Sequence, residues 1–379
     1  MAALHFKDGL KWTDLELSNF EGGLKIHPLR FENFKGRVHF ADDLLTLEKF
    51  NGKLGHSRFT ADVKYHFSDK AAHNHVHLTA PHLDIDELLN YNAPPTKNSS
   101  HSSKVNHDAT FSLYDLEFPN IDFVFEIGHL NYHHHKMDHF KAKIRMLQNH
   151  VIHIDKMNFD AAGGHFDFKG TLSGADKKHI YMQPNISVKN VDLDKFMVKF
   201  ENFGQDHLVS ENLHGKFSGQ ITGKIHLHGD LTPKMDDSEL TISMTVLNGR
   251  LENYAPIQAL ATYFQDKNVN KVLFDTLENT LKLKGGSLTI PLMTINSSLG
   301  FMELKGEQYL DEKMSMDYTI GIPWKMIGQV AGQKLFGRKN KEEETTDEIQ
   351  YREKNSRFVY LKLSGNIENY TVELAKKPR

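Results

Sequence analysis

Histidine is the residue type in this sequence that offers the most obvious chemistry. The chain has 24 histidines in 379 residues, and several are closely spaced, in the run His133–His135 and in alternating groups at 73–77 and 226–228. Alternate positions on a β-strand share a face, so a two-histidine metal site is geometrically possible. In Ile225–His228, however, the histidines take the polar positions opposite Ile and Leu. This pattern is typical of solvated outer-face histidines, and we expect no metal site.

Other catalytic chemistry has no recognisable motif here. The chain has no cysteine, which excludes disulfides, zinc–thiolate sites, iron–sulfur clusters and cysteine nucleophiles. The sequence contains no His-Glu-x-x-His helix signature, no Gly-x-Ser-x-Gly elbow, no phosphate-binding P-loop and no dinucleotide fingerprint. The acidic residues occupy turns, helix starts and outward strand positions, so no carboxylate pair stands out. We therefore expect a non-enzymatic protein with no catalytic residue and no cofactor.

The elements that would position any site are mostly strands. Bulky and polar residues alternate at 121–127, at 314–322 and at 359–363, as in an antiparallel sheet with one apolar face. Glycine-containing breaks at Asn51-Gly52, Gly163-Gly164, Asn248-Gly249 and Gly285-Gly286 are interpreted as hairpin turns. The bulky residues of this phase are our candidates for the lining of an apolar groove: Phe123, Phe125, Ile152, Ile154, Phe166, Phe168, Met316, Tyr318 and Ile320.

Helical patterns are few and short. Apolar spacing predicts a helix over 256–264 and another over 324–336, and acidic starts at Asp84 and Asp192 predict N-capped short helices. The helix expected over 324–336 has two interpretations. It either fills the apolar groove as a plug, or it is an interfacial helix whose residues Trp324, Ile327, Val330 and Phe336 face lipid. Residues 92–108 and the charged run 338–356 are expected to be mobile loops.

Internal similarity organises the chain. Phe34 matches Phe140, the segment 83–89 matches 191–197, and residues 152–170 match 288–306. About three related units therefore follow one another, each with several antiparallel strands and a short helical segment. We expect a first β repeat unit at 1–91, a loop at 92–108, a second unit at 109–203, and a C-terminal region with the third repeat at 204–379.

Composition limits the partners. The 46 basic and 49 acidic residues leave a net charge of −3, which gives no general reason to bind nucleic acid. No window approaches the ~18 consecutive apolar residues of a membrane-spanning helix. Phe and Met are abundant, at 25 and 13 residues, so the apolar phase is bulky. Because the predicted helices are too few to cover it, we expect a mostly β fold: an elongated, twisted antiparallel sheet that curls into a groove.

Residues 213–322 resemble the C-terminal region of AsmA-like proteins. The resemblance rests on a Gly-rich strand, an x-x-Gly-x-Leu element, a Pro-Ile helix start and the strands that follow, at Leu213–Gly215, Leu247–Leu251, Tyr254–Ile257, Val272–Leu277, Gly286–Pro291, Met293–Ser298 and Met316–Tyr318. The upstream repeats also look like AsmA-family strands, so the resemblance covers most of the chain.

The resemblance implies a periplasmic β-groove protein attached to the bacterial inner membrane by an N-terminal helix. Such proteins are implicated in outer-membrane assembly and in phospholipid transfer between membranes. This chain lacks the helix, and we expect that an anchored protein has been cut short.

Two other functions remain open from the sequence. One is a structural envelope scaffold or protein-interaction module, whose groove is filled by its own helices. The other is a hydrolase of envelope polymers, which would need a converging pair of acids that the sequence does not supply. The leading expectation is a groove that binds phospholipid acyl chains.

Overall fold

The computed structural model describes residues 12–23, 29–68, 72–89, 112–132, 135–199, 211–258, 261, 264, 267–310, 315–324, 348–352, 356–366 and 369–377. The chain is mostly β: eighteen strands of one largely antiparallel sheet, with a few short helices. It divides into two compact units. The first contains residues 1–161, 165–184 and 227–232, and the second contains 162–164, 185–226 and 233–379.

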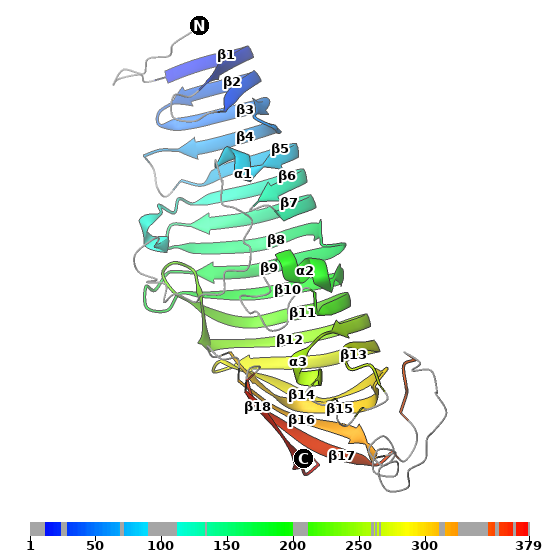
Figure 1. Cartoon of the computed structure of the whole chain (residues 1–379). Helices are drawn as coiled ribbons and strands as arrows, with labels where there is room; N and C mark the ends of the chain where they lie inside the picture. The colour runs from blue at the N-terminus through cyan, green and yellow to red at the C-terminus, as the bar shows by residue number, and fades with distance from the viewer. Residues whose placement is uncertain are drawn as a thin grey trace, which may run out of the picture. The chain divides into compact units, whose positions relative to one another are not determined.

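In the first unit, strands β1 to β8 follow one another in chain order (Figure 1). Each neighbouring pair is antiparallel except β5 and β6, which pair in parallel. The strands are β1 (Trp12–Gly23), β2 (Arg30–Ala41), β3 (Leu44–Leu54), β4 (Ser57–His66), β5 (Asn74–Asp84), β6 (Ile121–Tyr132), β7 (His135–Leu147), β8 (Val151–Ala161) and β9 (Gly164–Ser173). Helix α1 (Ile85–Leu88) follows β5, and the 3₁₀ turn η1 (Leu113–Asp115) precedes β6.

Strand β10 (Tyr181–Asp192) is divided between the units, and the remaining elements belong largely to the second. From β12 onward the described pairs are all antiparallel and join strands that follow one another in the chain. The elements are α2 (Leu193–Lys199), β11 (Leu213–Leu227), β12 (Pro233–Glu252), α3 (Ala255–Gln258), β13 (Lys271–Lys284), β14 (Ser287–Ser297), β15 (Gly300–Tyr309), β16 (Met316–Pro323), β17 (Phe358–Gly365) and β18 (Tyr370–Ala375).

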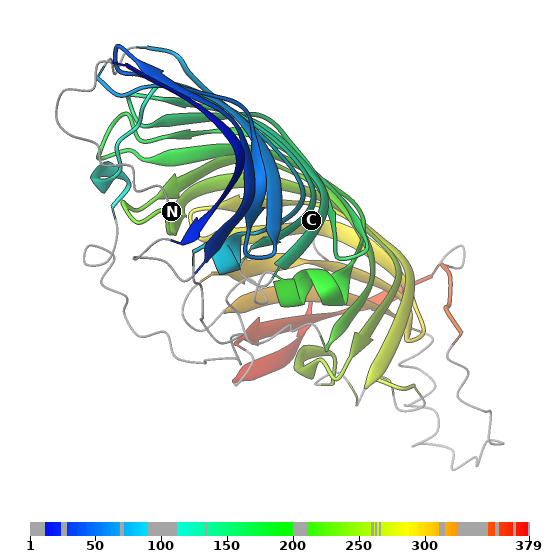
Figure 2. The ribbon, with the colours of Figure 1, turned by 90° about the horizontal axis from the view of Figure 1, so that it is seen from above.

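Bulges bend the strands of the first unit. Asn33, Lys49 and His139 lie inside strands with positive φ, and the pairing register shifts beside each of them. A bulge bends its strand and increases the local twist, and Figure 2 shows strands that bend along their length. In neither unit is the sheet closed or strongly curled. The curl expected from the shortage of helices is not seen: in the first unit helix α1 covers only one end of the apolar face, and the rest stays half-buried on an open sheet.

Two expected hairpin turns are wrong. Gly52 lies inside β3 and Gly249 inside β12. A side chain at Gly52 would meet the ring of Phe34, and one at Gly249 would overlap the ring of Phe274. These glycines therefore make room for an aromatic ring on a neighbouring strand. The turn at Gly285-Gly286 is confirmed between β13 and β14, and that at Gly163-Gly164 between β8 and β9.

The short helices agree well with their acidic starts. Asp84 caps α1, with its side chain accepting a hydrogen bond from the Glu87 backbone N–H, and α2 begins directly after Asp192. Of the helix expected over 256–264, the structure has α3 (Ala255–Gln258), and residues 259, 260, 262 and 263 lie outside the described residues. Residues 92–108 and most of 338–356 lie outside the described residues.

The element order repeats along the chain. The series β2, β3, β4, β5, α1 is followed by β7, β8, β9, β10, α2, with strands of nearly equal length at matching positions. The backbone conformations also match, because Asn33 and His139, one residue before the matched Phe34 and Phe140, both have positive φ. This agreement supports an internal repeat, while the domain boundaries drawn from it stay predictions.

Candidate functional site

An apolar row crosses the first unit from β1 to β8. In the strand register each member lies directly opposite the next, in the order Leu15, Val38, Leu47, Val63, Val76, Phe123, Ile144 and Ile154. All eight side chains are half-buried rather than buried. Their sequence neighbours on the same strands point to the other face, as strand alternation requires. We call these eight residues the apolar row.

Further apolar residues flank the row on the same face. Phe125 lies two positions from Phe123, and the two rings stack with centroids 5.7 Å apart. In register with Phe125 are Leu78 on β5 and Ala142 on β7. The apolar surface is therefore more than one residue wide along β5 to β7.

One end of this face is closed by helix α1. Ala80, Leu83, Ile127 and Leu130 form a buried cluster, and Ile85 and Leu88 of the helix pack against it. Nearby, the rings of Phe159 and Phe166 stack with centroids 5.0 Å apart. Short as it is, α1 provides two aliphatic side chains that cover the ends of β5 and β6.

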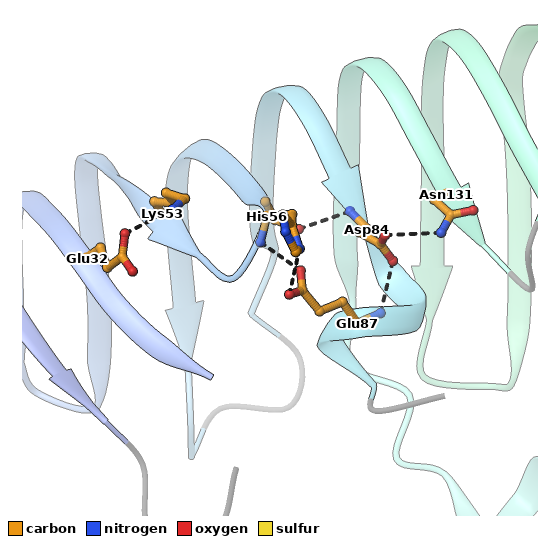
Figure 3. Close-up of polar contacts among 7 residues, drawn as sticks. Glu32, Lys53, His56, Asp84, Glu87 and Asn131 are labelled. Atoms are coloured by element: carbon orange, nitrogen blue, oxygen red, sulfur yellow. Dashed lines mark hydrogen bonds and ion pairs between the residues drawn. The ribbon is translucent and has the colours of Figure 1, made fainter. Parts of the chain in front are cut away.

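Polar contacts fix α1 in this position (Figure 3). The Glu87 carboxylate accepts a hydrogen bond from the His56 backbone N–H at 2.7 Å and lies 2.9 Å from His56 Nδ1. Asp84 accepts from Asn131 Nδ2 at 3.1 Å, and its own backbone N–H donates to Ser57 Oγ at 2.9 Å. The helix is thus tied to the β3–β4 turn and to β6.

The His56, Ser57 and Glu87 group has no catalytic geometry. Ser57 is fully buried and its hydroxyl oxygen already accepts the Asp84 N–H. The ion pair between Lys53 and Glu32, also drawn in Figure 3, joins two neighbouring strands at 3.0 Å. These contacts position the helix; they do not form an acid–base site.

At the opposite strand ends the apolar surface is more open. Phe67 is 58% exposed and packs against Tyr65 and Phe40, with ring centroids 5.1 and 6.1 Å away. Tyr65 and Phe40 both pair with Leu45. The exposed rings therefore continue the apolar face beyond Val38 and Val63.

The predicted groove residues of the first unit fall on this face. Phe123 and Ile154 belong to the apolar row. Ile152 lies two residues before Ile154 on the same face of β8, and it pairs with Met146 of β7. Phe166 is 5% exposed in the ring stack beside the closed end, and Phe168 is half-buried on the same strand. The strand register adds five residues to this face that the alternation of residue types does not identify: Leu15, Val38, Leu47, Val63 and Val76.

The predicted residues of the second unit lie elsewhere, in a closed core. Met316 and Ile320 are 5% and 7% exposed, in a cluster with Phe264 and with Leu361 and Leu363 of β17. Ile257 of α3 packs against the same cluster. Tyr318 donates a hydrogen bond from its hydroxyl to Gln308 Oε1 at 2.5 Å, and burial raises the pKa of its phenol.

The last predicted group is only partly described. Trp324 is 58% exposed, and its backbone N–H donates to the Arg357 carbonyl oxygen at 2.7 Å. Ile327, Val330 and Phe336 lie outside the described residues, so the interpretation of this segment as a plug or an interfacial helix stays a prediction.

Several of the described histidines pair with carboxylates. His73 lies 2.9 Å from Asp122, and the Asp160 carboxylate lies 2.8 Å from His139 and 2.6 Å from His165. These hydrogen bonds hold the pKa of Asp160 below its ordinary value. Within the described ranges, no three metal-ligating side chains come together. His133 and His134 are outside those ranges.

Comparison with known proteins found no matching family model, curated protein or solved structure. Among the helices that the structure describes, each is too short or too polar to cross a bilayer.

Proposed function

We propose that this protein is a non-enzymatic periplasmic protein that binds phospholipid acyl chains on the apolar face of its first unit. In this role it supports lipid transport between the inner and outer membranes and outer-membrane assembly. The proposal joins the AsmA-like sequence pattern with the surface chemistry of β1 to β8.

The observation that carries the proposal is the apolar row. Eight aliphatic or aromatic side chains succeed one another across eight strands, and each remains half-buried among the described residues. Contiguous apolar surface of this kind marks a site of interaction with an apolar partner. A row that runs across strands suits a long flexible hydrocarbon chain, which needs continuity more than a specific pocket.

The physical basis is exclusion of water from the acyl chain. Each buried CH₂ group contributes about 0.8 kcal/mol, so a continuous lining lowers the cost of holding a lipid outside a bilayer. Leu, Val, Ile and Phe offer no directional contacts, which would let a chain slide along the face. Transport would then require no covalent step.

Lipid extraction and mass spectrometry of the purified protein test this directly. Phe123→Asp places a charge on the apolar row, whereas Val124→Asp places one on the opposite face of the same strand. We expect co-purified phospholipid to fall at least fivefold in Phe123→Asp and to remain near the wild-type amount in Val124→Asp. Equal lipid content in all three proteins, or none in any of them, would contradict the proposal.

A second function is favoured by the second unit. Its apolar face is packed with its own side chains, such as Leu299 and Leu361 at 0% exposure, which suits a structural scaffold or a protein-interaction module with a self-filled groove. Lipid-free protein that retains wild-type function in cells would support this alternative. Phospholipid binding is therefore proposed for the first unit alone.

A further inference from the structure

The second unit has a shallow hollow on the sheet surface that the lipid-binding proposal does not use. It is an open depression with a volume of about 430 Å³. Three successive residues from each of three neighbouring strands line it: Ser218, Gly219 and Gln220 of β11, Ser243, Met244 and Thr245 of β12, and Glu278, Asn279 and Thr280 of β13.

Strand register assigns most of the side chains to one hydrophilic face. Ser243 is opposite Thr280 and Thr245 is opposite Glu278, while Met244 and its partner Asn279 alternate to the other face. By the same alternation Ser218 and Gln220 share a face of β11. Small hydroxyl side chains on the central strand thus lie between two longer side chains, Gln220 and Glu278.

Several of these groups are already oriented. The Ser243 and Thr280 hydroxyl oxygens are 3.2 Å apart. Ser218 Oγ accepts a hydrogen bond from the Asn190 backbone N–H at 2.9 Å, and Gln220 Nε2 donates to Asn185 Oδ1 at 3.2 Å. Hydroxyls that are held in place and can both donate and accept lose little freedom when they bind a polar ligand.

The lining selects one class of ligand. No Lys, Arg or His lines the hollow, and the Glu278 carboxylate would repel an anion. Met244 is the one bulky apolar residue of the nine, and its side chain alternates to the other face of the sheet, so an acyl chain would gain little. Hydroxyl, amide and carboxylate groups in an open hollow match the alternating donors and acceptors of a neutral polyol.

We propose that this hollow binds a neutral saccharide segment, with Glu278 and Gln220 accepting and donating hydrogen bonds to sugar hydroxyls over a floor formed by Ser243 and Thr280. The site belongs to the second unit and does not depend on lipid binding by the first. A saccharide site would give the protein a second kind of envelope contact, to a sugar polymer.

Saturation-transfer NMR on the full chain tests the site, with cellotriose and N,N′,N″-triacetylchitotriose as neutral probes. We expect transfer to at least one sugar, no competition from inorganic phosphate, and at least a fivefold loss in the double variant Ser243→Val/Glu278→Gln. Thr289→Val, a hydroxyl removal on β14 outside the hollow, is the matched control and should bind as wild type. The side chains of Ser243, Glu278 and Thr289 are not buried. We therefore expect the double variant and the control to melt at the wild-type temperature, and this is checked first.

Three results would overturn the proposal. They are no transfer to either sugar at millimolar concentration, an equal signal in the double variant, and displacement of the sugar by phosphate. Because phospholipid content is measured separately, failure here leaves the acyl-chain proposal untouched.

Discussion

The apolar faces of the two units are built from similar strands but are used differently. In the first unit the apolar row stays half-buried across eight strands, and α1 covers only one end. In the second unit the face formed by β15 to β17 is a closed core, in which Ile322 and Leu361 are fully buried and α3 packs against the cluster, whereas Ile242 of β12 and its partner Leu281 of β13 stay half-buried. An amphipathic strand pattern therefore defines an apolar face without defining what covers it.

Truncation of one leucine in each unit gives the largest expected contrast. Leu361→Ala should lower the free energy of unfolding by about 3 kcal/mol, because the residue is fully buried, whereas half-buried Leu47→Ala should cost about 1 kcal/mol. Urea unfolding checks this. Trp12 and Trp324 lie in different units, so fluorescence with the other tryptophan replaced by Phe reports on each unit separately. Equal losses would remove the distinction between open face and closed core.

Two turn glycines provide a matched pair. Gly55 and Gly285 have φ of +60° and +59°, but a Cβ at Gly55 would lie 2.5 Å from the Glu87 carboxyl, and one at Gly285 would meet nothing within 4 Å. Gly285→Ala should cost about 1 kcal/mol from backbone strain. Gly55→Ala should cost about 2 kcal/mol, since it also displaces Glu87 from His56. Urea unfolding of the two variants measures the difference, and equal costs would show that Glu87 does not hold the β3–β4 turn.

Removal of the α1 cap should have a smaller effect, confined to the closed end of the first unit. Asp84→Ala should cost about 1 kcal/mol, because the Glu87 N–H loses its acceptor. Asp84→Asn keeps an acceptor and should behave nearly as wild type. Hydrogen exchange at the Leu89 amide, which donates to the Ile85 carbonyl, should speed up only in the alanine variant. Acceleration in both variants would mean that charge, and not the cap, holds the helix.

The smallest expected effect is electrostatic. His139 and His165 hold the pKa of Asp160 below its ordinary value, so the associated stability is present above the unfolded-state pKa and is lost as pH falls through the lowered folded-state pKa. The double variant His139→Gln/His165→Gln should raise the pKa of Asp160, as measured by carboxyl NMR. Asp155, whose pKa is lowered chiefly by Arg145, should not move. An unchanged Asp160 would mean that these exposed pairs do not form in solution.

The sequence predicted the strands well and their surroundings poorly. Alternation identified β6, β16 and the core of β17, and the acidic starts identified α1 and α2, because both signals are local. Gly52 and Gly249 have the local pattern of turns, but they lie inside strands because the rings of Phe34 and Phe274 pack over them, and that packing depends on the tertiary structure.

The candidate site was only partly accessible from sequence for a similar reason. Phe123 and Met316 have the same alternating environment along the chain, yet one lies on a half-buried face and the other in a core. That difference depends on which segments pack across the face, which is long-range information. The pairing of His73 with Asp122 likewise needed the register of β5 against β6, which no local motif encodes.

The parallel pairing of β5 with β6 affects the order in which the strand pairings of the first unit form. The hairpins on either side form between chain neighbours, but this parallel pairing joins Asn74 to Ile121 and Asp84 to Asn131, which are 47 residues apart in the sequence. Closing such a loop costs at least about 3 kcal/mol of chain entropy. The β5–β6 pairing should therefore form later than the hairpin pairings on either side of it.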